Sequence, residues 1–111
     1  MNDIITFKVF VYGTLKKGLH NHSLIKHSKF LGEYNTGPGF TKIVRGLPYL
    51  IKDDEGIGCS GEVYEVSKLT LDMLDRLEGH PNWYERTIIK VTSDEDKELP
   101  VWCYLMDKER I

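Results

Sequence analysis

The sequence contains few cysteines, no long apolar run and no large excess of either charge. Two of its 111 residues are cysteine, Cys59 and Cys103, and no spacing pattern pairs them. We therefore expect two free thiols that pack as small hydrophobic residues in a reducing cytosol. No stretch of about 18 apolar residues is present, so a membrane-spanning helix is not expected. The net charge of −2 argues against a nucleic-acid partner, which usually requires a basic face.

The start of the chain also lacks targeting features. Residues 1–6 have no basic segment and no small-residue cleavage site, so we expect no secretory signal and a cytoplasmic location. No internal repeat or Pro/Ser-rich linker divides the chain, which predicts one domain over residues 1–111. The composition, 41% hydrophobic and 29% charged, is that of a globular protein with one core. The oligomeric state stays open, and a monomer is compatible with the sequence.

Short apolar stretches separated by glycine and proline predict many strands. Residues 7–12 alternate, with Phe7, Val9 and Val11 on one face and Lys8, Phe10 and Tyr12 on the other. Further strands are expected at residues 29–34, 43–52, 61–66, 85–93 and 101–106, with the polar run 93–98 as a hairpin loop.

Two helices are expected among these strands. The main one begins after Ser67 as N-cap and ends at Gly79, with Pro81 beyond it. Residues 21–28 predict a short second helix with Asn21 as its cap. Strands with one central helix, without βαβ alternation, predict an α+β fold built on a small mixed β-barrel.

The main helix carries an acid on its apolar stripe. Leu71 and Leu74 define this stripe, and either Leu77 or Glu78 continues it. Seven positions of about 100° each bring Glu78 back to within roughly 20° of Leu71. Such a carboxylate either reaches solvent or pairs with Arg86, or it lies in a functional cavity where desolvation raises its pKa. Spacing alone leaves both interpretations open.

The segment Tyr12-Gly13-Thr14-Leu15 directly follows the first apolar strand. Gly13 leaves no side chain to block a ligand, and successive N–H groups in such a turn can form an anion-binding nest. The alternative is an ordinary strand end. A metal site is not expected, because His20 and His22 have no third ligand at suitable spacing. Arg86 is expected to pair with an acid at the end of the helix rather than to contact substrate.

Taken together, these segments resemble the γ-glutamylcyclotransferase superfamily, in particular its short γ-glutamylamine cyclotransferase-like branch. The matching segments are residues 9–18 (Val-Phe-Val-Tyr-Gly-Thr-Leu-Lys-Lys-Gly), 61–64 (Gly-Glu-Val-Tyr), 74–81 (Leu-Asp-Arg-Leu-Glu-Gly-His-Pro), Tyr84, Arg86 and 103–106 (Cys-Tyr-Leu-Met). The likeness covers nearly the whole chain, with mild departures mainly in residues 37–50.

The resemblance implies a barrel fold and a cavity that holds one folded glutamyl unit. It implies that Glu78 is the general acid/base and that Tyr12, Gly13, Thr14 and Leu15 bind the substrate, together with Tyr104. Tyr84 and Arg86 would support the site, with no metal or cofactor. The expected reaction converts an L-γ-glutamyl amine or amino acid to 5-oxoproline and a free amine.

Two other functions remain open on the same fold. One is a non-catalytic protein that binds or senses a small γ-glutamyl molecule. The other is a related enzyme that removes a γ-glutamyl cap from a specialised metabolite. The leaving group is equally open, and glutathione, a γ-glutamyl amino acid and γ-glutamyl-lysine are all compatible with the sequence.

Overall fold

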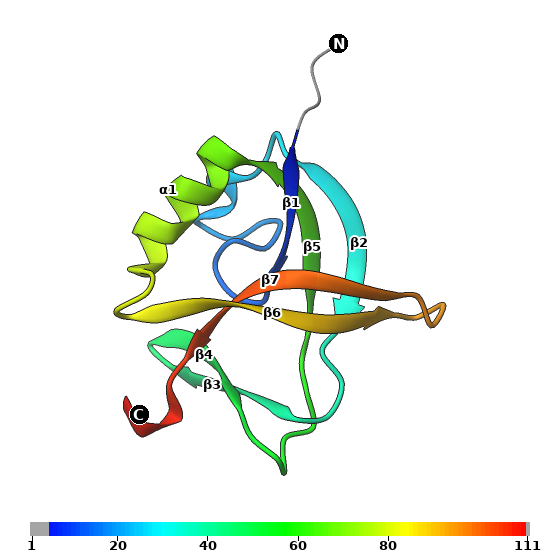
Figure 1. Ribbon diagram of the computed structural model, residues 1–111, viewed down its shortest axis with the longest axis vertical. Coiled ribbons are helices and arrows are strands. Elements are labelled where there is room, and N and C mark those ends of the chain that lie inside the picture. The colour runs from blue at the N-terminus through cyan, green and yellow to red at the C-terminus, as the bar shows by residue number, and fades with distance from the viewer. Residues whose placement is uncertain (1–4, 111) are drawn as a thin grey trace.

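The computed structural model describes residues 5–110 (Figure 1). Its elements are β1 (Thr6–Val11), η1 (His22–Leu24), β2 (Lys29–Asn35), β3 (Phe40–Arg45), β4 (Leu47–Lys52), β5 (Ser60–Ser67), α1 (Lys68–Glu78), β6 (Tyr84–Ser93), β7 (Glu98–Met106) and η2 (Lys108–Arg110). The expectation that no signal precedes the domain falls largely on residues 1–4, which lie outside the described residues.

Five strands form a closed barrel in the order β1-β5-β2-β6-β7, and β3 and β4 form a separate two-stranded sheet. Neighbouring barrel strands are antiparallel except at the β1–β7 seam, which is parallel and joined at Val9 and Trp102. Figure 1 shows α1 beside β1 and β5, and the β3–β4 hairpin below β6 and β7. This architecture confirms the predicted α+β barrel with one main helix.

The second half of strand β1 is buried on both faces, at Val9, Phe10 and Val11. Val9 and Val11 pack in a cluster that contains Leu71 and Leu74 of α1. Phe10 and Tyr12 belong to a second cluster, made mainly of residues from β5, β6 and β7. Strand β1 therefore contributes residues to both clusters.

The main helix has the boundaries that its local signals predict. Ser67 accepts a hydrogen bond from the backbone N–H of Thr70 at 3.1 Å, which satisfies one free amide of the first turn. At the other end Gly79 adopts the left-handed conformation with φ of 67°, which a side chain would disfavour.

Two of the predicted elements are wrong. Residues 43–52 are not one strand, because Gly46, with φ of 77°, turns the chain between β3 and β4. Residues 21–28 do not form an eight-residue helix, and only the 3₁₀ turn η1 is present. The Asn21 side chain makes no cap, and its amide instead donates to the Thr14 hydroxyl at 2.8 Å.

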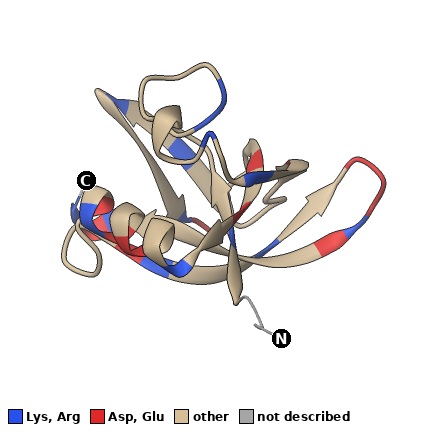
Figure 2. Ribbon diagram, turned by 90° about the horizontal axis from the view of Figure 1, so that it is seen from above, with Lys and Arg blue, Asp and Glu red and all other residues tan. Residues whose placement is uncertain are grey.

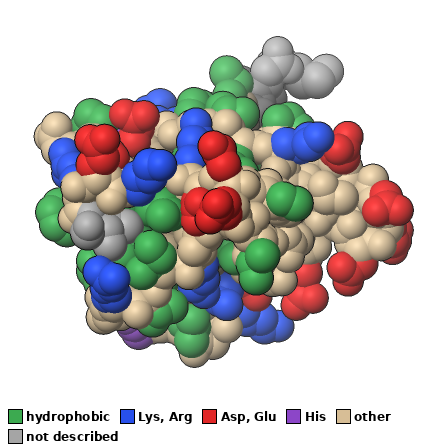
Figure 3. Space-filling model, turned by 90° about the horizontal axis from the view of Figure 1, so that it is seen from below, with side chains coloured by type: hydrophobic (Ala, Val, Ile, Leu, Met, Phe, Trp, Pro, Cys, Tyr) green, Lys and Arg blue, Asp and Glu red, His purple; other side chains and the backbone are tan. Residues whose placement is uncertain are grey.

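Charged side chains of both signs are spread over the molecule. Figure 2 shows Lys and Arg interspersed with Asp and Glu, with acids gathered at the turn between β6 and β7. On the face seen in Figure 3, hydrophobic side chains stand in small groups among charged ones. Within residues 5–110, no helix has the length and hydropathy needed to cross a membrane.

Candidate active site

A small cavity lies where the end of β1, the end of α1 and the β3–β4 hairpin meet. Six consecutive residues from Phe10 to Leu15 line it, together with Pro48, Glu78 and Tyr104. The fold therefore brings the acid of α1 to the predicted turn, although 64 positions (78 − 14) separate Glu78 from Thr14 in the sequence. Tyr104 reaches the same cavity from β7.

Glu78, rather than Leu77, continues the buried stripe of α1. Leu77 is 44% exposed, whereas Leu71 and Leu74 are only 2% and 0% exposed. Glu78 is only half-buried, and this burial raises the pKa of its carboxyl group from 4.5 to about 7. A carboxyl group with such a pKa can take up and release a proton near neutral pH.

The predicted pairing of Arg86 with a helix-end acid is present, and the acid is Asp75. The guanidinium Nε donates to Asp75 Oδ1 at 2.8 Å. Among residues 5–110, Glu78 takes part in no salt bridge. The carboxyl group in the cavity is therefore not neutralised by this arginine.

Gly13, Thr14 and Leu15, in the turn after β1, line the cavity. Within residues 5–110, the N–H groups of Gly13, Thr14 and Leu15 appear as donors in no hydrogen bond. The segment before η1 stabilises this turn, since the N–H of Asn21 donates to the Thr14 carbonyl at 3.0 Å. The Nδ1 atom of His22 lies 3.0 Å from the Leu15 carbonyl oxygen. Three successive amides without a protein acceptor can bind an anionic group.

Tyr12 connects the turn to β7. Its buried hydroxyl donates to the backbone carbonyl of Tyr104 at 2.5 Å. Burial raises the pKa of the Tyr12 hydroxyl well above its usual value, so the phenol keeps its proton and this bond. Tyr12 thus fixes the relative position of two segments that line the cavity.

Pro48, at the start of β4, covers the cavity and was not identified from the sequence. A Cβ atom added to Gly13 would lie 2.7 Å from Pro48 Cγ, so the turn and the hairpin are in close contact. Tyr84 holds this cover, because its hydroxyl donates to the Pro48 carbonyl at 2.9 Å. Nothing in the spacing of residues 37–50 points to this contact, since it joins segments that are distant in sequence.

The cavity is smaller than the resemblance to the γ-glutamylcyclotransferase superfamily implied. Its volume is about 40 Å³, which is enough for only a few water molecules. Small-molecule sites usually measure about 300–1,000 Å³. In this conformation the cavity therefore lacks the expected room for a folded glutamyl unit, and Pro48 packs closely against Gly13 at its lining.

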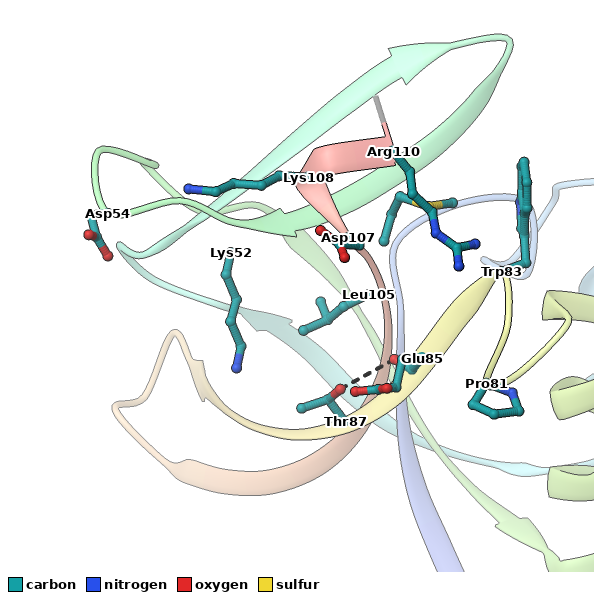
Figure 4. A pocket seen from close by; sticks show the side chains of 11 residues that line it. Lys52, Asp54, Pro81, Trp83, Glu85, Thr87, Leu105, Asp107, Lys108 and Arg110 are labelled. Atoms are coloured by element: carbon teal, nitrogen blue, oxygen red, sulfur yellow. Dashed lines mark hydrogen bonds between the residues drawn. The ribbon is translucent and has the colours of Figure 1, made fainter.

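A wider groove of about 480 Å³ lies between β6, β7, the end of β4 and η2 (Figure 4). Its charged side chains are Lys52, Asp54, Glu85, Asp107, Lys108 and Arg110. All six are exposed, and both cations and acids lie around the groove. Exposed charges keep their water and gain little electrostatic strength, so we place the candidate site at Glu78 instead.

Comparisons with known proteins agree with this architecture. The chain matches the family described as "Gamma-glutamyl cyclotransferase, AIG2-like" over residues 9–111. It is 41% identical over 97 residues to a Methanocaldococcus jannaschii protein with a provisional gamma-glutamylcyclotransferase name, covering 86% of this chain and 81% of that protein. It is 37% identical to the mouse gamma-glutamylaminecyclotransferase, covering 87% of this chain and 74% of the relative.

A solved structure supports the same relationship. The crystal structure of a mouse AIG2-like protein superimposes with a TM-score of 0.82 at 31% identity, covering 91% of this chain and 77% of that one. The segment that matches the family model, residues 9–111, contains β1 from Val9 onward, the turn after it, α1 and β7. The chain therefore belongs to the AIG2-like gamma-glutamyl cyclotransferase family.

Proposed function

We propose that this protein converts an L-γ-glutamyl amine or amino acid to 5-oxoproline and a free amine, with Glu78 as the general acid/base. The observation that carries the proposal is that Glu78, a half-buried acid, and residues 13–15, whose N–H groups donate to no acceptor within residues 5–110, line one cavity. Family membership supports the reaction class. Nucleophile and electrophile belong to the same substrate molecule, so no cofactor enters the proposed reaction.

Glu78 carries the protons in this mechanism. The α-ammonium group of the substrate gives one proton to the ionised carboxylate, and the free amine then attacks the γ-carbonyl carbon. A carbon–nitrogen bond forms and closes a five-membered ring. In all, two protons leave the α nitrogen, and Glu78 passes them in turn to the leaving nitrogen as its bond to the γ carbon breaks. Positioned proton transfer of this kind contributes about 10²–10⁴-fold to the rate.

The turn amides stabilise negative charge. Charge develops on the γ-carbonyl oxygen during attack, and the substrate also carries an α-carboxylate. The N–H groups of Gly13, Thr14 and Leu15 are suited to either group, and loss of one such donor costs roughly 10²–10³-fold in related oxyanion sites. The bent substrate must also be held in its ring-closing shape, which a narrow cavity favours.

Glu78→Gln tests the proposal directly. The variant keeps the size of the side chain but cannot exchange protons, so 5-oxoproline release should fall at least about 10²-fold while the fold is retained. The measurement is mass spectrometry of 5-oxoproline after incubation with γ-glutamyl amines, γ-glutamyl amino acids and glutathione. The mouse relative's name favours the amines, and the panel decides among the leaving groups.

Glu85→Gln is the matched control, because Glu85 is an exposed acid in the wider groove. This variant should retain full activity. A folded Glu78→Gln protein as active as the parent would refute the assignment, and loss of activity in Glu85→Gln alone would move the site to the groove. Binding of a γ-glutamyl compound without turnover would instead favour a sensor.

A further inference from the structure

Asp75 lies one helical turn before Glu78 and is held from two sides. The Tyr104 hydroxyl donates to its Oδ1 at 2.7 Å. The Arg86 guanidinium donates to both oxygens, at 2.8 Å from Nε and 3.2 Å from the terminal nitrogen. The side chains of Arg86 and Asp75 are only 18% and 19% exposed, so this fork is shielded from solvent.

Arg86 is itself fixed in place. Its guanidinium carbon lies 4.2 Å from the ring centroid of Trp102, a cation–π contact. Burial alone would raise the pKa of Asp75, but the hydrogen bonds from Arg86 and Tyr104 lower it. Asp75 is therefore ionised at neutral pH and can only accept hydrogen bonds.

This arrangement determines which way the Tyr104 proton points. A phenol has one proton to donate, and here Asp75 receives it. The oxygen of Tyr104 is left with lone pairs, so toward any ligand in the cavity it can act only as an acceptor. The unpartnered amides of residues 13–15 have the opposite character and can only donate.

We propose that Asp75, clamped by Arg86, is a positioning residue that keeps the Tyr104 hydroxyl as an acceptor for the α-ammonium group of a γ-glutamyl substrate. This inference rests on the proposed function and names the substrate group that Tyr104 recognises. The cavity then has an acceptor end, Glu78 and Tyr104, and a donor end, the turn after β1. A free α-amino group becomes a requirement for tight binding as well as for ring closure.

The test compares two ligands that differ only in this group. One is a γ-glutamyl amine, measured by kcat/KM, and the other is the glutaryl amine without the α-amino group, measured by its inhibition constant. Tyr104→Phe and Asp75→Asn should each lower kcat/KM for the γ-glutamyl amine about tenfold, the loss expected for one hydrogen bond to a charged group. Neither substitution should raise the inhibition constant of the glutaryl amine to a similar extent.

A double-mutant cycle separates positioning from a general structural role. If Asp75 acts through Tyr104, adding Asp75→Asn to Tyr104→Phe should cause no further loss of kcat/KM. The proposal would be overturned if the kcat/KM losses of the two single variants multiplied in the double variant. It would also be overturned if the substitutions weakened binding of both ligands equally. Asp72→Asn is the control on the same helix, because it breaks only the exposed Lys68–Asp72 ion pair and should leave activity unchanged.

A second readout needs no substrate. Asp75→Asn removes the negative charge beside Tyr104 and leaves the Arg86 cation, so its phenol should titrate at lower pH than in the parent. Tyrosinate absorbance should then report one more phenol in the alkaline range, and this signal should vanish in Asp75→Asn/Tyr104→Phe. An unchanged titration would contradict the proton assignment.

If Asp75→Asn does not fold, because Arg86 loses its partner, the neutral pair Asp75→Asn/Arg86→Gln takes its place in the cycle and is read by kcat/KM. If the parent releases no 5-oxoproline from any compound, the proposed function fails. The titration then still decides whether Asp75 directs the Tyr104 proton.

Discussion

At position 78, folding and chemistry favour different protonation states. Burial at the end of α1 disfavours the charged carboxylate, and this desolvation raises the pKa of Glu78 from 4.5 to about 7. In the proposed mechanism, Glu78 must nevertheless lose its proton before it can act as the general base. A pKa near the working pH allows both, since a large fraction of the molecules then carries the ionised form.

This conflict predicts a pH-dependent cost in stability. The folded state holds the Glu78 proton more tightly than the unfolded chain, so the cost is absent below pH 4.5, grows as pH rises, and is complete above about pH 7. A shift of 2.5 units (7 − 4.5) corresponds to at most about 3 kcal/mol, and less because the carboxyl group keeps some solvent contact.

Glu78→Gln, which stays neutral, should therefore gain stability relative to the parent as pH rises from 4.5 to 7. Denaturant unfolding of both proteins across this range measures the difference in free energy of unfolding at each pH. The Gln amide can also change the free energy of unfolding by an amount that does not depend on pH. This constant difference does not matter, because only the change with pH reports the ionisation of Glu78. Two curves that run parallel would show that Glu78 is not desolvated.

Sequence reasoning identified Glu78 but missed Pro48 and Asp75. The helical period is a local property, so spacing from Leu71 and Leu74 is enough to place an acid on the buried face. Pro48 and Asp75 are positioned by contacts between residues that are distant in the sequence. Pro48 contacts Tyr84, 36 positions away, and Asp75 contacts Tyr104, 29 positions away. No local pattern encodes such contacts.

The same distinction holds for whole elements. Residues 67–79 contain both helix signals, an N-cap and a left-handed glycine, and the predicted helix is correct. The mainly apolar run 43–52 predicts one strand, whereas Gly46 turns the chain there and makes a hairpin of β3 and β4. In residues 21–28 the side chain that looked like a cap is engaged with Thr14. A tertiary contact there outweighs a weak local preference.

The contact between the β1 turn and the β3–β4 hairpin predicts how a substitution at Gly13 behaves. An added Cβ atom would lie 2.7 Å from Pro48 Cγ but 3.7 Å from Pro48 Cβ. Gly13→Ala should therefore displace the hairpin and lower kcat/KM by roughly 10²-fold, the scale expected when substrate is misplaced by about 1 Å. Pro48→Ala removes the clashing atom.

Steady-state kinetics of Gly13→Ala, Pro48→Ala and the double variant measure this effect. The double variant should recover at least part of the activity lost in Gly13→Ala, because Cβ of residue 48 leaves room for the new methyl group. If Pro48→Ala gave no recovery, crowding of the amides themselves, rather than the hairpin, would explain the loss.

At the scale of the whole molecule, the barrel and its cover are held by different means. Strands β6 and β7 pair without interruption from Tyr84–Met106 to Thr92–Glu98. The β3–β4 hairpin belongs to no barrel sheet and is attached through buried side chains such as Leu50 and through the Tyr84–Pro48 hydrogen bond. Such an element can open without unfolding the barrel.

Entry of the proposed γ-glutamyl substrate would require an opening of this kind, because the cavity that Pro48 lines measures only about 40 Å³. Hydrogen exchange should therefore be faster for the paired amides of β3 and β4 than for those of β6 and β7, which serve as the internal reference. A saturating glutaryl amine should slow exchange in the hairpin more than in the reference strands, since a hairpin that contacts the bound ligand opens less often. If hairpin and reference amides exchanged at one common rate, β3–β4 would open only with the whole barrel, and substrate would have to enter by another route.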